Sequence, residues 1–462
     1  MKKLYFICFI LCFCANVFAQ SEFQVYFNNG SDNKTIYYRV TSAELATVAV
    51  TFRGELPTSY REYTTYIVVP ATVIAPAAAL PPAVPGVTYH VTSVDANAFY
   101  DCTGLDSVLL PSSVTFIDSL AFGGCTILKN CVMPSDINFI GEKAFYNCRM
   151  LSDIELPTNI TKISKETFRD CHSLTSVNIP DMVNTISEQA FLNCLALEAV
   201  NISSSVNKIS TSSFLGCSSL NSINVDTDNT KFMSEDGVLY SYLQDTLILY
   251  PPKKAGVEFT TPNSIKSVGD YSFAYNFYLK KINFNNSLTE IGTAAFYNNT
   301  GLSVVNISDS VSYIGKSAFY NCKNLDLIRI EATIPPDIQD FTFYNVPNAV
   351  SVVVPCEFEE DYKDSEWGEY FTNIQGYCIP TDISEIEYQQ EINIFPNPVK
   401  DDLFININDR IERVEIYSLS GNLMILENNF NNSTSLASIP QGVYLVKIIT
   451  NKDVIIKKII KN

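Results

Sequence analysis

The side chains best able to do chemistry in this 462-residue sequence are its cysteines, because a thiolate can act as a nucleophile or as a metal ligand. Seven of them share one position of a repeat: Cys102, Cys125, Cys148, Cys171, Cys194, Cys217 and Cys322. A catalytic thiol is one special residue, and no Cys-x-x-Cys zinc motif occurs after residue 19. Later copies place Asn276 and Asn299 at the same position. We therefore expect a small buried group that faces the backbone at a turn, with free thiols in preference to disulfides.

Other catalytic groups are scarce. His90 and His172 are the only histidines, which leaves little scope for zinc sites or for histidine acid–base chemistry. His172 follows Cys171 directly, but Cys171 is one of seven equivalent cysteines, so we expect a surface histidine and not a dyad. The sequence has no His-Glu-x-x-His, no Gly-x-Ser-x-Gly and no glycine-rich phosphate loop. We therefore predict a protein that is not an enzyme and has no cofactor or metal. Paired carboxylates for glycoside hydrolysis stay open, because their spacing in the fold is invisible in the sequence.

Composition narrows the class of partner. Lys and Arg number 31 against 49 Asp and Glu, so the formal net charge is −18. Only 17% of residues are charged, whereas 47% are hydrophobic. An acidic chain without a long basic run argues against nucleic acid and against anionic membrane surfaces.

A 23-residue repeat must position these residues. Phe99, Phe122, Phe145, Phe168, Phe191 and Phe214 follow one another at this spacing, and the pattern resumes at Phe273, Phe296 and Phe319. Within one unit, Val177 and Ile179 alternate with polar neighbours, which predicts a short strand, and Ala190-Phe191 is expected on a 3₁₀ or irregular helical return segment. One coil cannot bury its own apolar side, so the coils must stack into a solenoid with a parallel sheet. Phe168→Ala is expected to lower the free energy of unfolding by about 3–5 kcal/mol.

The repeat resembles the BspA-like leucine-rich repeats of bacterial surface proteins over residues 85–355, on the pattern Cys-x-x-Leu-x-x-Val-x-Ile. The resemblance implies a mostly β fold, a leucine-rich-repeat solenoid of 23-residue coils. It also implies a secreted or surface protein that binds host proteins or acts as an adhesin.

The flanking segments suggest further parts. Lys2 and Lys3 precede a short apolar run, which predicts a signal peptide over residues 1–19 that is cleaved between Ala19 and Gln20. Residues 20–84 are expected to form an N-terminal β cap with a stiff Ala- and Pro-rich connection over residues 71–86. Residues 226–262 interrupt the period and read as a hairpin insertion. No other stretch is long and apolar enough to predict a transmembrane segment in the mature chain.

Two cysteines stand outside the repeat position near its end. Cys356 and Cys378 flank an aromatic and acidic segment over residues 356–379, which is expected to cap the solenoid. They are the candidate disulfide of this exported chain, and the alternative is that both are unpaired packing residues. Residues 380–392 are expected to form an acidic linker.

Residues 393–462 have short alternating strands separated by turn signals, which predict a small β-sandwich. Phe395-Pro396-Asn397-Pro398, Gly421 and Pro440-Gln441-Gly442 follow in the order of the C-terminal sorting domain of type IX (Por) secretion substrates, which this segment resembles. The resemblance implies export by the type IX secretion machinery. The protein would then be secreted or held on the outer-membrane surface of a Gram-negative bacterium.

One column of residues should face outward from the strands, between two core positions. It begins with Leu109, Val132 and Glu155, and its candidate binding residues are Asn178, Asn201, Asn224, Asn283, Asn306 and Arg329. This stripe is either a contact strip for an extracellular protein or glycan, or an asparagine ladder that stabilises the sheet, and we favour the ladder. The function expected from the whole sequence is binding in an adhesin or host-interaction role. The alternatives are a carbohydrate-active or glycan-accessory protein and a structural surface-layer component.

Overall fold

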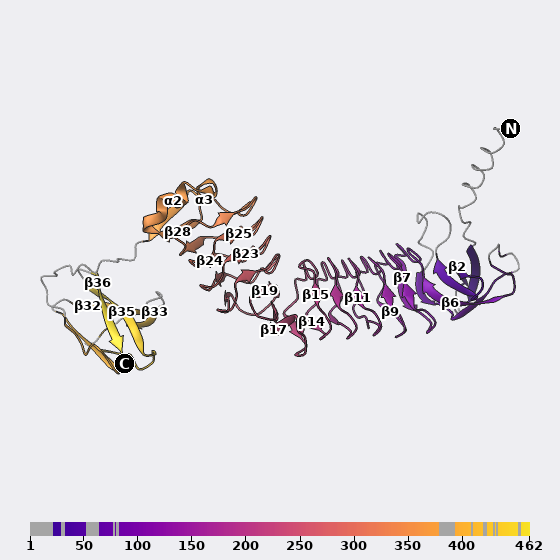
Figure 1. Cartoon of the computed structure of the whole chain (residues 1–462), viewed down its shortest axis with the longest axis horizontal. Coiled ribbons are helices and arrows are strands. Elements are labelled where there is room, and N and C mark those ends of the chain that lie inside the picture. The colour runs from indigo at the N-terminus through magenta and orange to yellow at the C-terminus, as the bar shows by residue number, and fades with distance from the viewer. Residues whose placement is uncertain are drawn as a thin grey trace, which may run out of the picture. The chain divides into compact units, whose positions relative to one another are not determined.

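The computed structural model describes residues 22–28, 33–51, 64–76, 79, 83–377, 393–407, 410–418, 423–427, 430, 433–450 and 454–462. The chain divides into two compact units, Met1–Cys378 and Ile379–Asn462 (Figure 1). The predicted signal-peptide cut between Ala19 and Gln20 lies outside the described residues, as do Cys378 and the predicted linker over residues 380–392.

The first unit is a solenoid whose coils contribute strands to two separate columns. The first column consists of β6 (Thr88–Val94), β8 (Phe116–Ile117), β10 (Phe139–Ile140), β11 (Lys162–Ile163), β13 (Thr185–Ile186), β15 (Lys208–Ile209), β21 (Ser267–Val268), β23 (Glu290–Ile291), β25 (Tyr313–Ile314) and β27 (Asp337–Ile338). The second consists of β4 (Thr64–Val68), β7 (Gly104–Leu109), β9 (Asn130–Val132), β12 (Ser176–Asn178), β14 (Ala199–Ile202), β16 (Ser222–Val225), β20 (Glu258–Thr260), β22 (Lys281–Asn283), β24 (Val304–Ile307), β26 (Leu327–Ile330), β28 (Ser351–Pro355) and β29 (Asn373–Tyr377).

Strand pairing follows the sequence period. β12 pairs in parallel with β14 so that Val177 lies opposite Val200, 23 residues later. This confirms the predicted solenoid and parallel sheet. The second strand of the coil, β13, was not anticipated, because two residues are too short to show an alternating pattern.

The return segment differs from its prediction. It forms successive turns, not a 3₁₀ or irregular helix, with left-handed residues at Gln189 (φ 55°) and Asn193 (φ 59°). The reason is that alternate N–H groups bond to the next coil, as Phe168 N does to Ala190 O over 2.8 Å. A helix would use those donors within its own segment.

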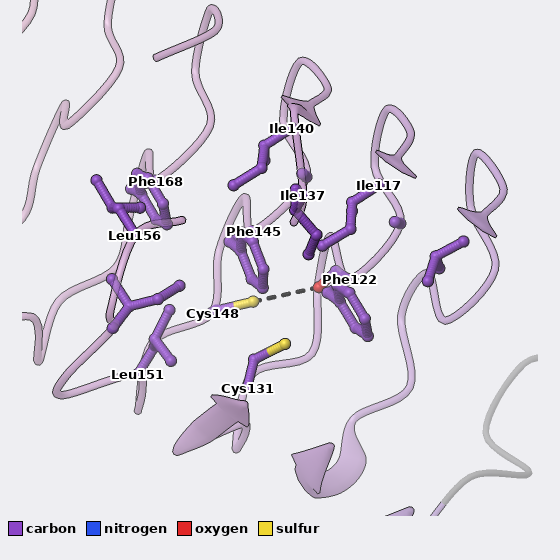
Figure 2. Packing of buried hydrophobic residues seen from close by; sticks show 14 of the residues in the cluster. Ile117, Phe122, Cys131, Ile137, Ile140, Phe145, Cys148, Leu151, Leu156 and Phe168 are labelled. Atoms are coloured by element: carbon purple, nitrogen blue, oxygen red, sulfur yellow. Dashed lines mark hydrogen bonds between the residues drawn. The ribbon is translucent and has the colours of Figure 1, made fainter. Parts of the chain in front are cut away.

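The repeated phenylalanines form a stack through the core. The Phe122 and Phe145 ring centroids lie 5.3 Å apart, and those of Phe145 and Phe168 5.5 Å apart, with nearly parallel planes (Figure 2). These rings are fully buried beside the repeated Leu, Ile and Val side chains. The stack places identical residue types at intervals of one coil, so equivalent surface positions also recur at this interval.

The N-terminal part is a β meander joined to the first coil. β1 (Glu22–Asn28), β2 (Asn33–Ser42) and β3 (Thr47–Thr51) pair antiparallel, and β3 continues in parallel with β6. Part of the Ala- and Pro-rich segment, expected to be only a connection, forms strand β5 (Thr72–Ile74), which pairs antiparallel with β6.

The insertion separates two blocks of coils. β17 (Phe232–Glu235), β18 (Val238–Ser241) and β19 (Thr246–Leu249) form an antiparallel meander. β19 then pairs in parallel with β21, where the coils resume. Two core clusters accordingly meet here, one reaching Leu239 and the other starting at Val238.

The end of the first unit is covered by η1 (Cys356–Phe358), α2 (Glu359–Lys363) and α3 (Glu366–Tyr370). Buried Trp367 packs against Phe343, with ring centroids 5.1 Å apart, and donates from Nε1 to the carbonyl of Pro336. Cys356 is disulfide-bonded. Its predicted partner Cys378 lies outside the described residues, so the pairing stays a prediction, supported by the register that pairs Pro355 with Tyr377 immediately before both cysteines.

The second unit is a two-sheet sandwich, as predicted. One sheet holds β30 (Asn393–Phe395), β31 (Asp402–Asn406) and β34 (Ser433–Ser435). The other holds β33 (Leu423–Glu427), β32 (Ile411–Ser418), β35 (Gly442–Thr450) and β36 (Val454–Lys461). All neighbours within these sheets are antiparallel. Among the described residues of both units, no helix has the length and apolar character needed to cross a membrane.

Candidate binding surface

The predicted outward-facing asparagines lie in register on neighbouring strands. Asn178, Asn201 and Asn224 are exposed on β12, β14 and β16. Asn201 Nδ2 donates to Asn178 Oδ1 over 2.7 Å, and Asn224 Nδ2 donates to Asn201 Oδ1 over 2.9 Å. In-register parallel strands bring equal side chains within hydrogen-bond distance of one another, which gives this asparagine ladder.

A second set lies on the later coils. Asn306 Nδ2 donates to Asn283 Oδ1 over 2.6 Å, and Asn283 Nδ2 donates to Glu258 and Thr260. Arg329 follows in register with Asn306 on β26, and its guanidinium lies 5.2 Å from the centroid of the Tyr377 ring. Arg329 therefore ends this ladder with a cation–π contact.

The column is divided into two parts in the structure. β16 is the last strand of one sheet and β20 the first of another, so Asn224 does not bond to Asn283. The insertion β17–β19 enters between these coils, and in strand β20 the equivalent residue is Thr260. The structure thus brings together two separate groups of three residues, and a binding role for either group stays a prediction.

A further polar ladder was missed from the sequence. It lies at the left-handed turn residue just before each repeated Cys or Asn and, in the last coil, before Val346. Asn193 donates to Asp170 over 2.9 Å, and Asn321 donates to Asn298 over 2.5 Å. The signal was present: nine of the ten turn positions hold residues that tolerate positive φ, namely Asp101, Gly124, Asn147, Asp170, Asn193, Gly216, Asn298, Asn321 and Asn345.

The repeated cysteines are free and buried, as predicted. Cys148 Sγ donates to the carbonyl of Phe122 over 3.2 Å (Figure 2). The same contact is made, one coil apart, by Cys171, Cys194, Cys217 and Cys322. Burial raises the pKa of the Cys148 and Cys171 thiols, which keeps them protonated. A protonated thiol used as a donor is not a nucleophile, so this column is structural.

Asparagine can replace cysteine here because both donate to the same acceptor. Asn299 Nδ2 bonds to the carbonyl of Phe273 over 2.7 Å, in the place of the thiol. The prediction of a small group that faces the backbone is therefore confirmed.

Several ionisable groups of the described residues form ion pairs. His172 Nε2 lies 4.0 Å from Asp170 Oδ1, whereas the neighbouring Cys171 thiol donates a hydrogen bond to the backbone carbonyl of Phe145. Glu166 is buried but accepts from Arg169 over 2.9 Å and lies 3.6 Å from Lys143 Nζ. Within the described ranges, no three His, Cys, Asp or Glu side chains gather to hold a metal ion.

One open cavity of about 350 Å³ lies on the solenoid where the second block of coils begins. Lys253, Lys254 and Lys280 line it together with Val257, Phe277 and Tyr278. The backbone joins its two walls, because Lys280 N donates to Val257 O over 2.7 Å. The sequence carries a signal for this site in Pro251-Pro252-Lys253-Lys254 and Phe277-Tyr278-Leu279-Lys280-Lys281, but only the fold shows that the two segments meet.

Comparison with known proteins agrees with the two units. The model of the BspA type leucine rich repeat region matches six copies over residues 92–221 and 255–365. The model of the secretion system C-terminal sorting domain matches residues 393–462. No curated protein matches the chain.

Two solved structures share the solenoid fold. A leucine rich cell surface protein from Faecalibacterium prausnitzii is 24% identical, with a TM-score of 0.54, over 76% of this chain and 94% of the other. The pneumococcal vaccine antigen PcpA is 21% identical, with a TM-score of 0.55, over 78% of this chain and 99% of the other. At these identities the likeness concerns the fold alone.

The repeat model covers more than half of the residues, and the gap between its two matched ranges contains the insertion β17–β19. The sorting domain coincides with the second unit and marks a secreted or cell-surface protein. The chain therefore belongs to the BspA-type leucine-rich repeat proteins and carries a secretion system C-terminal sorting domain.

Proposed function

We propose that the mature chain is exported by the type IX secretion machinery and binds an extracellular protein or glycan, in an adhesin or host-interaction role. The location would be the medium or the outer-membrane surface of a Gram-negative bacterium. The sorting domain at residues 393–462 supports the route.

The observation that carries the binding role is the surface of the coil stack. Its thiols are buried donors, and one of its exposed columns holds hydrogen-bonded amides such as Asn178 and Asn201. A rigid, repetitive and largely uncharged surface is suited to recognition, because its groups are held in place before the partner arrives.

A binding screen tests this role. The mature chain, starting at Gln20, would be titrated over immobilised extracellular-matrix proteins and over a glycan array at physiological salt. Saturable binding to one class supports the proposal. No binding to either class contradicts it, and self-association of the chain in the same experiment would favour a surface-layer component.

The export route has its own test. A chain that lacks residues 393–462 would be expressed in a bacterium that has the type IX machinery. We expect it to accumulate in the periplasm, whereas the full chain reaches the surface or the medium. Equal export of both chains would contradict the proposed route.

A further inference from the structure

We propose that the cavity between Lys253 and Tyr278 binds an acidic peptide segment of the partner protein, with carboxylates on the lysines and an apolar side chain on the aromatic rings. We call it the lysine–aromatic pocket, lined by Lys253, Lys254, Lys280, Val257, Phe277 and Tyr278. This inference rests on the proposed binding function and names the chemistry of the partner at one site.

The charge of the pocket is the first argument. Three lysines meet here in a chain with 31 basic and 49 acidic residues. Lys254 is held by Asp236, with Nζ 2.6 Å from the carboxylate, and its side chain is only 12% exposed. Lys253 and Lys280 are exposed and have no ion-pair partner in the described part of the chain. The ammonium groups of Lys253 and Lys280, from the two segments that line the cavity, are therefore open to an anionic ligand.

The acidic residues elsewhere do not cancel this local charge. Glu258 is near the pocket in sequence, but it pairs with Lys281 over 2.8 Å. More distant carboxylates are screened at physiological salt, where the Debye length is about 8 Å. A ligand carboxylate in contact with Lys253 or Lys280 is screened much less, so the nearby lysines dominate the attraction.

The apolar side chains are the second argument. Phe277 and Tyr278 are 44% and 50% exposed and Val257 62%, side by side at one cavity. Exposed aromatic residues are enriched at the centre of protein interfaces. The solenoid core does not need these rings, because the neighbouring Phe273 and Leu279 fill the core positions.

The lining also favours a peptide over a sugar. Hydroxyl-rich ligands need side-chain acceptors as well as donors, and among the lining side chains only the Tyr278 hydroxyl can accept. The lysines supply hydrogen-bond donors, and Val257 and Phe277 supply apolar surface. A ligand with carboxylates and an apolar side chain is complementary to this lining, as in an acidic peptide segment that contains Leu or Phe.

The test uses the mature chain and a fluorescein-labelled peptide in which Glu alternates with Leu and Phe. Fluorescence anisotropy would give its Kd at physiological salt and at higher salt. Two matched peptides replace every Glu by Gln, or every Leu and Phe by Ser. We expect the acidic apolar peptide to bind saturably and each matched peptide at least about tenfold more weakly.

Two double variants locate the site. Lys253→Glu with Lys280→Glu reverses the free charges of the pocket and should raise the Kd about tenfold or more. Lys129→Glu with Lys208→Glu makes the same change of charge at exposed lysines on other coils, and should leave the Kd almost unchanged. Phe277→Ser with Tyr278→Ser tests the rings and should also weaken binding about tenfold. Circular dichroism would verify that each variant is folded.

Several outcomes would overturn the inference. An equal loss of affinity in the pocket double variant and in the control double variant would mean that net charge alone controls binding. Equal binding of the Gln peptide would exclude carboxylate recognition. Binding of heparin, but not of the acidic peptide, at the same lysines would assign the pocket to an anionic glycan. A chain that binds a matrix protein equally well with and without Lys253→Glu and Lys280→Glu would keep the proposed function and reject this pocket.

Discussion

The thiol of Cys148 donates a hydrogen bond to the backbone carbonyl of Phe122, one coil earlier, over 3.2 Å (Figure 2). The same carbonyl accepts from the N–H of Cys125, so the thiol is its second donor. Repeated along the stack, this contact joins neighbouring coils inside the core, where water cannot replace it.

Removing the thiol should weaken the stack. Cys148→Ala loses one buried hydrogen bond and leaves a small void, so we expect the free energy of unfolding to fall by about 1–3 kcal/mol. Cys148→Ser keeps a donor at this position and should lose less. Urea unfolding followed by circular dichroism measures both, and equal losses would show that the hydrogen bond contributes nothing.

The buried thiols should be unreactive in the folded protein. Burial raises the pKa of Cys131 to about 12 and also raises the pKa of Cys148 and Cys171, so reaction with Ellman's reagent at pH 8 should be negligible. In denaturant without reductant we expect the eight free cysteines to react. After reduction ten should react, if Cys356 pairs with Cys378 as predicted. Ten reactive thiols before reduction would contradict that disulfide.

The phenylalanine stack should dominate stability. Phe168 lies between Phe145 and Phe191, with centroids 5.5 and 5.4 Å away, so Phe168→Ala should cost about 3–5 kcal/mol. Phe277→Ala is the matched control, because Phe277 is 44% exposed, and should change the free energy of unfolding by less than about 1 kcal/mol. Similar losses in urea unfolding would contradict this assignment of the core.

The asparagine ladder can be separated from binding. Asn201→Ala removes two side-chain hydrogen bonds, to Asn178 and from Asn224, and should lower stability by about 0.5–1.5 kcal/mol. Glu198→Ala is an exposed control on the same coil and should be nearly neutral. If Asn201→Ala keeps full stability but loses ligand binding, the column is a contact strip and not a stabilising ladder.

Acid should weaken the sorting domain through Glu415. The Tyr417 hydroxyl donates to its carboxylate over 2.8 Å, and Lys447 and Arg413 lie 3.2 and 2.7 Å away, so its pKa is lowered. The ionised group therefore stabilises the fold above its unfolded pKa, about 4.3, and this contribution is lost as the pH falls through the lower folded pKa.

Glu415→Gln should accordingly destabilise the domain at pH 7, by about 1–3 kcal/mol, and the difference from the native chain should shrink towards pH 3. Hydrogen exchange of the β35 peptides would measure it. The fluorescence of Trp367, the only tryptophan, reports on the first unit and serves as the internal control. A difference that stays constant with pH would reject the ion-pair explanation.

The sequence alone determined the solenoid, its 23-residue coil and the separate C-terminal sandwich. A repeat fold can be predicted without knowledge of contacts between residues distant in sequence, because each coil packs on the next at a fixed spacing. Phe145 and Phe168 therefore had to stack, and Val177 had to face Val200. The burial of the cysteines could be predicted from the same repeat. Asn299 at an equivalent position indicated that the side chain there faces the backbone.

Only the tertiary structure shows the features that depend on contacts between coils and on the place where the 23-residue repeat is interrupted. The two-residue strand β13 exists only through its pairing with neighbouring coils. In the turns that follow Gln189, alternate N–H groups donate to the next coil. The asparagine column divides at Asn224 because the meander β17–β19 enters between the two blocks. Lys253 and Lys280 meet across one cavity because the chain returns after this insertion, and no local pattern fixes that path.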